Sequence, residues 1–258
     1  MRQLDYNKEI DRICSFIDKY LHKTRFSKVI VGLSGGIDSA LTAALCVKTL
    51  GSQNVIGVMM PYKNSHPDSL NHAKEVANQL NIHYEIIPIS DMVDTYFNTY
   101  QVEADQLRRG NRMARERMCI LFDLSAKHRA LVAGTSNKSE IFVGYCTQYG
   151  DSACAFEPIA HLYKTEVKEM SKALKLPESV INKNPTADLW DGQTDEKELG
   201  ISYKDLDEIL HYILDKKLTL EEIQSKGIDK HKIELVISKI KNSEFKRKMP
   251  EVIEKVWE

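Results

Sequence analysis

The chain has 258 residues, of which 42% are hydrophobic and 28% are charged, and its 36 basic and 37 acidic side chains nearly cancel. This length can bury a substantial core, and the charge balance argues against a protein that mainly coats nucleic acid or an anionic membrane. No apolar run approaches the ~20 residues that span a bilayer, and the N-terminal residues show no signal-peptide pattern. We therefore expect a cytoplasmic protein with neither a membrane nor a nucleic acid as its partner.

Strand-like and helix-like patterns alternate along most of the chain. Short apolar runs rich in β-branched residues predict strands, and apolar residues spaced three or four apart predict helices. Ser65 is the expected cap of the third helix, and Pro88 marks the third strand as an edge strand. In chain order, the patterns predict a helix (4–21), a strand (28–33), a helix (40–50), a strand (54–60), a helix (65–80), a strand (84–89), a helix (103–128), a strand (130–134) and a helix (164–174).

This alternation predicts an α/β fold, with a doubly wound parallel sheet and helices on both faces. Ligands of such sheets bind beyond the carboxyl ends of the strands, so Ser34 and Thr135 mark the expected site. Residues 1–181 are the predicted nucleotide-binding core and 182–200 a mobile loop rich in Pro, Gly, Asn and Asp. Residues 201–258 are a predicted helical appendage of the same domain, which includes a capping box formed by Thr219 and Glu222.

The most informative segment follows the first strand and reads Gly32-Leu33-Ser34-Gly35-Gly36-Ile37-Asp38-Ser39. Backbone amides at such a strand-to-helix turn bind anions, and the two adjacent glycines let the backbone approach a phosphate closely. The common GxxxxGKS/T loop is absent, and a carboxylate, Asp38, stands where a lysine is usual. A carboxylate beside a polyphosphate calls for a hard cation such as Mg²⁺. The simpler alternative is a tight turn in which Asp38 and Ser39 only cap the next helix.

The string SGGIDS resembles the SGGxDS signature of the pyrophosphate-loop ATP pyrophosphatases, which transfer AMP from ATP to a substrate oxygen. Further segments, in the same order, are similar to NAD synthetases in particular. They are Gly110–Met118 (GNRMARERM), Gly134–Glu140 (GTSNKSE) with Tyr149-Gly150-Asp151, Pro185–Leu189 (PTADL) running into Gln193–Tyr203, and Phe245–Pro250 (FKRKMP).

This resemblance implies roles for individual residues. ATP contacts fall on the residues of the glycine loop, 32–39, and on Thr135, Lys164 and Thr186, and Mg²⁺ ligands on Asp38 and Glu140. Contacts with deamido-NAD fall on Arg115, Gln148 and Lys246, and Asp151 lies near the ammonia site. Asp38, Lys164 and Asp151 are the implied catalytic residues. Three positions depart from the pattern expected of the dinucleotide pocket, namely Gln148, Ala155 and Phe245.

The resemblance also implies the reaction and the partners. It implies an adenine nucleotide alpha-hydrolase-like fold, a homodimer, and a ligase that amidates deamido-NAD with ATP and ammonia and releases AMP and pyrophosphate. None of the five cysteines has the setting of a glutaminase nucleophile, which favours free ammonia, or ammonia from a separate partner, over a fused glutaminase. Two alternatives remain, a tRNA-modifying ATPase that shares the loop and a non-catalytic nucleotide sensor. The absence of CxxC pairs and the balanced charge argue against the first.

Overall fold

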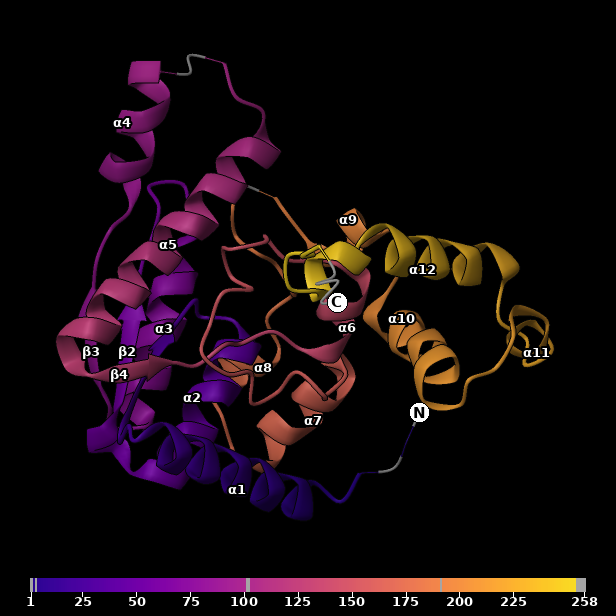
Figure 1. Cartoon of the computed structure of the whole chain (residues 1–258), viewed down its shortest axis with the longest axis horizontal. Coiled ribbons are helices and arrows are strands. Elements are labelled where there is room, and N and C mark those ends of the chain that lie inside the picture. Colours follow the sequence, from indigo (N-terminus) through magenta and orange to yellow (C-terminus); the bar gives the residue numbers. More distant parts are fainter. Residues whose placement is uncertain (1, 3, 101–102, 191, 254–258) are drawn as a thin grey trace, which may run out of the picture.

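The computed structural model describes residues 2, 4–100, 103–190 and 192–253, and it contains a parallel β-sheet, seen in the left-hand part of Figure 1. Within these ranges the sheet has four strands, β1 (Lys28–Gly32), β2 (Val55–Met59), β3 (His83–Ile86) and β4 (Ala130–Val132), in the order β3-β2-β1-β4. Ile30 of β1 lies opposite Ile56 of β2 and Val132 of β4. The predicted α/β class is confirmed, and β3 lies at an edge as Pro88 indicated.

Helices cover both faces of the sheet. Successive residues of β1 point to opposite faces, so Val29 and Val31 belong to one core cluster and Ile30 to the other. The first cluster receives apolar side chains from α1 (Tyr6–Thr24), α2 (Ile37–Leu50), α3 (Pro67–Gln79), α7 (Lys164–Ala173) and α8 (Glu178–Ile181). The second receives them from α4 (Ser90–Tyr100) and α5 (Gln106–His128). This doubly covered sheet is the predicted architecture.

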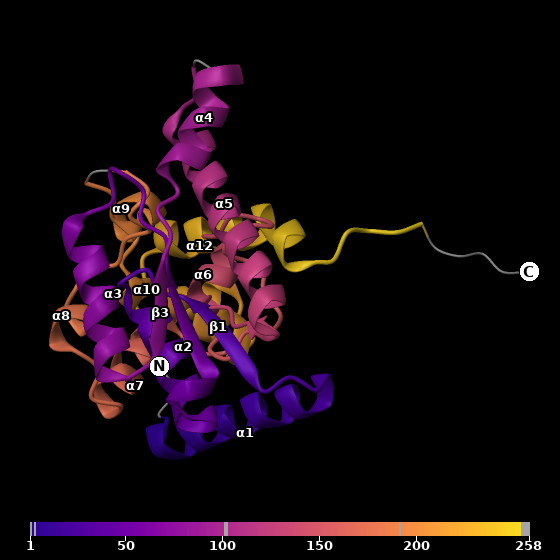
Figure 2. The ribbon, with the colours of Figure 1, turned by 90° about the vertical axis from the view of Figure 1, so that its left-hand side faces the viewer.

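The C-terminal helices form a third apolar cluster beside the sheet, with α6 (Lys138–Val143) (Figure 1). The helices that contribute are α9 (Asp195–Leu199), α10 (Tyr203–Leu210) with a π-helical turn (His211–Asp215), and α12 (Lys230–Asn242). Helix α11 (Leu220–Gln224) packs against α12. The predicted capping box of Thr219 and Glu222 starts α11. Figure 2 shows that the chain leaves the body of the molecule after the 3₁₀ turn Glu244–Arg247.

Several local predictions differ from the structure. His66, and not Ser65, caps α3, because the Ser65 hydroxyl already accepts a hydrogen bond from the Tyr62 amide. Helix α4 was not predicted, since its Asp, Thr and Asn residues favour helix weakly and its buried contacts come from Val93 and Phe97 alone. Helix α9 lies within the predicted loop 182–200, of which Asp191 lies outside the described residues.

Within the described ranges, no helix combines the length and the apolar character that crossing a membrane requires.

Candidate active site

The two strand ends chosen from the sequence are neighbours in the structure. β1 and β4 pair in parallel, so the segments that follow them leave the same edge of the sheet. Ser34 and Thr135 both line a cavity of about 810 Å³. Nine of the residues assigned from the sequence line this cavity as well, namely Gly32, Leu33, Gly36, Asp38, Ser39, Glu140, Asp151, Lys164 and Lys246, and Thr186 lines it from the loop after α8.

The glycine turn has the backbone conformation that its sequence predicts. Gly35 adopts φ +73°, which disfavours residues with a side chain, and a Cβ atom there would overlap the Ser69 carbonyl oxygen. The Ser34 hydroxyl accepts from the Gly36 amide at 3.2 Å, and the Ser39 hydroxyl donates to the Gly36 carbonyl at 2.9 Å. Helix α2 then begins at Ile37 without a side-chain cap, so its first amides remain available to an anion.

An ion cluster joins the starts of three helices at this edge. The Lys164 ammonium lies 2.5 Å from an Asp38 oxygen and 2.8 Å from a Glu140 oxygen. Asn137, the cap of α6, donates to the other Asp38 oxygen at 2.8 Å and accepts from the Glu140 amide at 3.1 Å. Tyr203 of α10 donates to the same Glu140 oxygen at 3.2 Å. Residues far apart in the sequence thus share one charge centre.

Burial and like charge shape the protonation of this cluster. Burial raises the pKa of Glu140 to about 7, and although Lys164 opposes the rise, Asp38 adds to it. Burial also acts against a charged Lys164, but the carboxylates of Asp38, Glu140 and Asp195 outweigh it and raise the pKa of Lys164. The pKa of Asp195 is raised by burial as well. The cluster therefore holds more acidic than basic groups and favours an added cation.

The oxygens of Asp38 and Glu140 suit Mg²⁺ in chemistry and position, because they converge on a single point that Lys164 contacts. In the part of the chain that the structure describes, no group of three or more His, Cys, Asp or Glu side chains forms a metal site. Two carboxylates match the usual Mg²⁺ arrangement, in which phosphate oxygens and water complete the coordination. The residues therefore fit the ion as partial ligands.

Asp151 lies in the cavity wall, where its Oδ1 accepts from the Thr147 amide at 2.8 Å. Burial raises its pKa, and the hydrogen bonds from Thr147 and the charge of Lys246 limit the rise. Such a carboxylate is a better proton acceptor than an exposed one, as the predicted role beside ammonia requires.

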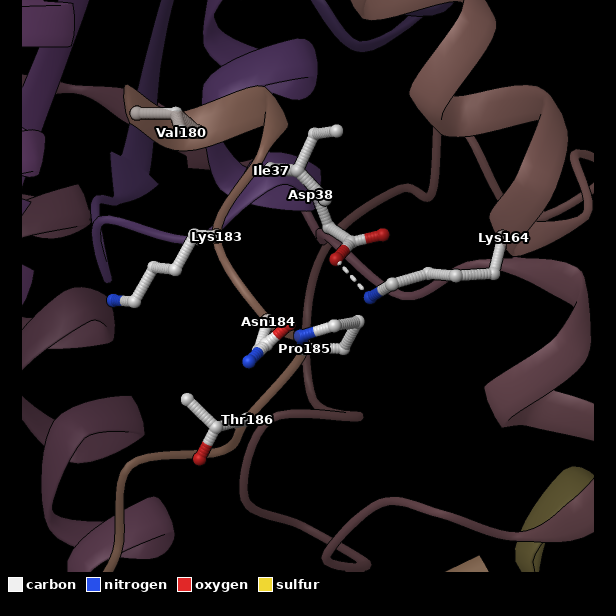
Figure 3. Close-up of a pocket in the computed structure, with 9 residues that line it drawn as sticks. Ile37, Asp38, Lys164, Val180, Lys183, Asn184, Pro185 and Thr186 are labelled. Carbon is white, nitrogen blue, oxygen red and sulfur yellow. Dashed lines mark hydrogen bonds and ion pairs between the residues drawn. The ribbon is translucent and has the colours of Figure 1, made fainter. Parts of the chain in front are cut away.

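The loop after α8 covers one side of the cluster (Figure 3). It runs beside Asp38, and Ile37, Asp38 and Lys164 line a small cavity of about 30 Å³ together with Asn184, Pro185 and Thr186. The Thr186 hydroxyl accepts from the Asp188 amide at 3.0 Å, and Asp188 in turn accepts from the His66 amide at 3.0 Å. This loop therefore contacts the start of α3, and its predicted mobility stays a prediction.

Only some of the residues expected to contact the dinucleotide line the large cavity. Lys246 lines the large cavity and donates to the carbonyl oxygens of Gly144 and Cys146 at 2.8 and 2.7 Å. The Arg115 side chain donates to the Gln148 carbonyl oxygen at 3.2 Å, and neither residue is among the described residues that line the cavity. Phe245 is exposed. Arg117, from the same GNRMARERM segment, lines the cavity instead, and burial lowers its pKa to about 10.

Five site residues were not predicted, and one of them is Tyr203, which donates to Glu140. Asn137 bridges Asp38 and Glu140, and Asp195 accepts from Tyr203 at 3.0 Å and from Tyr145 at 3.0 Å. Arg117 and Lys183 are the other two, and both line the cavity. Asn137, Asp195 and Arg117 lie inside the quoted motifs, so a search of each motif for every polar residue would have included them. Lys183 lies two residues before the segment Pro185–Leu189 and outside every quoted motif, so nothing in the sequence marked it as a site residue.

A parallel sheet with helices on both faces, and an acid pair beside a glycine turn at the carboxyl ends of its strands, is the arrangement of an α/β protein of the adenine nucleotide alpha-hydrolase-like fold. A family model described as NAD synthase matches residues 9–250. The NH(3)-dependent NAD(+) synthetase of Fusobacterium nucleatum is 50% identical over 252 residues, which are 97% of this chain and 97% of that protein.

Solved structures agree. The NH3-dependent NAD synthetase from Campylobacter jejuni is 35% identical with a TM-score of 0.83, and the alignment covers 98% of this chain and 100% of that one. The NMN synthetase from Francisella tularensis is 29% identical with a TM-score of 0.86, covering 99% and 100% respectively. The chain belongs to the NAD synthase family, whose members are ligases that form a C–N bond in NAD biosynthesis.

Proposed function

We propose that this chain is an ammonia-dependent ligase that converts deamido-NAD to NAD at the expense of ATP. The observation that carries this function is the convergence of Asp38, Glu140 and Lys164 on the glycine turn, in a chain half identical to an NH(3)-dependent NAD(+) synthetase. The tRNA-modifying alternative is not favoured, because relatives that are 50% and 42% identical are NH(3)-dependent NAD(+) synthetases by name.

In the first step, a carboxylate oxygen of the nicotinate ring attacks the α-phosphorus of ATP. The bond from this phosphorus to the bridging oxygen breaks, and the electron pair leaves on pyrophosphate. The amides at the start of α2 and the hydroxyl groups of Ser34 and Ser39 hold the phosphates in line. Asp38 and Glu140 would hold Mg²⁺, which when bound would neutralise charge on the departing pyrophosphate. Thr135, Lys164 and Thr186 are the further proposed ATP contacts.

In the second step, the ammonia nitrogen attacks the acyl carbon, AMP leaves with the oxygen that linked it, and the nitrogen loses a proton. Asp151 accepts this proton, since its carboxylate lies in the cavity wall and its pKa is raised by burial. Arg115, Gln148 and Lys246 remain the proposed contacts of the dinucleotide.

The likeness to an NMN synthetase supports a second candidate acceptor, nicotinate mononucleotide, which carries the same ring carboxylate. Gln148, Ala155 and Phe245 are neutral or apolar, and each departs from the pattern expected of a dinucleotide pocket. These three departures are a further reason to test the mononucleotide as the acceptor.

We further propose that the chain acts as a cytoplasmic homodimer. Phe16 of α1 and Phe122 of α5 are exposed, which gives each helix an apolar side chain for a partner subunit to cover. Sedimentation of the purified chain as a monomer at micromolar concentration would reject the dimer.

The deciding experiment is a mass-spectrometric assay of products. The chain is incubated with ATP, Mg²⁺ and either deamido-NAD or nicotinate mononucleotide, with ammonia or glutamine as nitrogen donor. We expect equimolar NAD and AMP from deamido-NAD with ammonia, and little product with glutamine. Formation of ADP in place of AMP would reject the mechanism, and a preference for the mononucleotide would reassign the acceptor.

A further inference from the structure

Lys183 is a second lysine beside the glycine turn, and neither the sequence motifs nor the proposed mechanism uses it. It follows α8, and its ammonium donates to the Ser69 hydroxyl at 2.9 Å and to the Gly35 carbonyl at 3.5 Å. Gly35 is the residue of the turn with positive φ, so Lys183 contacts the backbone of the glycine turn itself. Lys183 lines both the small cavity and the large one.

This ammonium has no carboxylate partner among the described residues. Both of its hydrogen-bond acceptors are neutral oxygens, which leaves one of its three N–H groups free. Burial lowers the pKa of Lys183, and the more distant Asp188 and Asp68 only partly oppose this. A half-buried cation without a counter-ion is costly unless an anion joins it.

Lys164 alone cannot neutralise the negative charge of the ATP phosphates. Its ammonium is already held between Asp38 and Glu140, whereas the triphosphate of ATP carries several negative charges. Figure 3 shows the side chains of Lys183 and Lys164 on opposite sides of Asp38, with the Lys183 ammonium directed away from Lys164. The two lysines therefore approach the glycine turn from different directions.

We propose that Lys183 binds the pyrophosphate part of ATP and stays bound to pyrophosphate when this group leaves. The inference rests on the proposed function for its reaction, but pyrophosphate binding can be measured without turnover. It makes Lys183 a direct ligand contact, and not only a link between the loop and α3.

The test is calorimetric titration of the full chain with inorganic pyrophosphate and Mg²⁺, and separately with AMP. Lys183→Gln removes one charged hydrogen-bond donor, so pyrophosphate affinity should fall roughly tenfold to a hundredfold. AMP affinity should change less than about twofold, and Lys183→Arg should recover most of the pyrophosphate affinity.

Two control variants separate the possible causes. Lys168→Gln removes the same charge from an exposed position on α7 and should leave pyrophosphate binding unchanged. Ser69→Ala cuts the link to α3 but keeps the ammonium, so its loss should be below about threefold. Equal losses in Ser69→Ala and Lys183→Gln, equal losses for AMP and pyrophosphate, or no pyrophosphate binding by the unaltered chain would each overturn the proposal.

The outcome is distinct from that of the proposed function. If the chain binds pyrophosphate through Lys183 but forms neither NAD nor AMP, the reaction is wrong and the lysine assignment stands. If NAD forms and Lys183→Gln binds pyrophosphate normally, only the lysine assignment fails.

Discussion

Asp207 offers a quantitative test of how the C-terminal helices support the site. Its side chain is fully buried on α10, and it accepts hydrogen bonds from the Ser139 hydroxyl and, at 2.8 Å, from the Thr165 amide. The Ser139 hydroxyl also accepts from the Lys164 amide at 2.9 Å. One carboxylate therefore joins the first turns of α6 and α7, which carry Glu140 and Lys164.

Removing this carboxylate should cost much of the stability of a typical domain. Asp207→Ala leaves the Ser139 hydroxyl and the Thr165 amide without their charged acceptor. Each such bond contributes about 1.5–3 kcal/mol, so we expect a loss of roughly 3–6 kcal/mol. Burial raises the pKa of Asp207 from 3.8 to about 6, against the opposing effect of its two donors. The folded state thus holds the proton more tightly than the unfolded state does.

The pH dependence follows from this difference. The stabilisation linked to the protonated form is complete below pH 3.8 and is lost as pH rises through about 6. For Asp207, a pKa raised from 3.8 to about 6 corresponds to about 3 kcal/mol of stabilisation of the folded state. Between pH 4 and 7, the free energy of unfolding of the wild type should therefore fall by up to about 3 kcal/mol relative to Asp207→Asn, which does not titrate.

The assay is denaturant unfolding of both proteins at closely spaced pH values, with Asp215→Asn as a matched control. Asp215 lies in the same C-terminal part, but hydrogen bonds from Lys138 and His211 outweigh its desolvation and lower its pKa to about 2. Its stabilisation is therefore lost only as pH falls from 3.8 toward 2, so the wild type and Asp215→Asn should give parallel curves between pH 4 and 7. Parallel curves for Asp207→Asn in this range would refute the reasoning.

Three further predictions concern the site. Gly35→Ala should weaken ATP binding at least about tenfold, because positive φ and overlap with the Ser69 carbonyl both oppose a Cβ atom; an unchanged affinity in a nucleotide titration would exclude the turn from the site. Asp151→Asn should lower kcat about 10²–10⁴-fold at saturating ammonia. The wild-type rate should rise with pH as Asp151 ionises above its usual pKa, whereas the variant should lose this rise, and near-normal amide formation would reject the role. Asp38→Asn should raise the Mg²⁺ concentration for half-maximal AMP formation at least about tenfold, and a chelator should abolish turnover of the wild type; an identical Mg²⁺ dependence would remove Asp38 from the ligands.

The features predicted well are those that short stretches of sequence determine. The run 28–33 is apolar and β-branched, and most of it becomes β1, while Gly35 makes the turn because glycine can adopt the positive φ that the turn requires. The neighbouring positions of Ser34 and Thr135 followed from a general property, since parallel strands bring their carboxyl ends to one edge.

The features that were missed depend on contacts between distant segments. Asn137 donates a hydrogen bond to Asp38, which lies 99 positions away in the chain, and no local sequence pattern predicts this pair. Tyr203 reads as one more apolar residue of a helix until the fold brings its hydroxyl to Glu140 and Asp195. Burial of a polar group is itself a tertiary property, so the raised pKa of Glu140 has no signal in the sequence.

These contacts bear on where the site ends along the chain. The predicted core stops at residue 181, yet Tyr203 bonds to Glu140, Asp195 raises the pKa of Lys164, and Asp207 fixes the first turn of α7. A chain cut after residue 200 would keep the sheet and the glycine turn but would lose Tyr203 and Asp207. Lys164 would then remain paired with Asp38 and Glu140, but Glu140 would lose the hydrogen bond from Tyr203 and the first turn of α7 would lose its bond to Asp207. The C-terminal helices are therefore as much a part of the proposed catalytic centre as the glycine turn is.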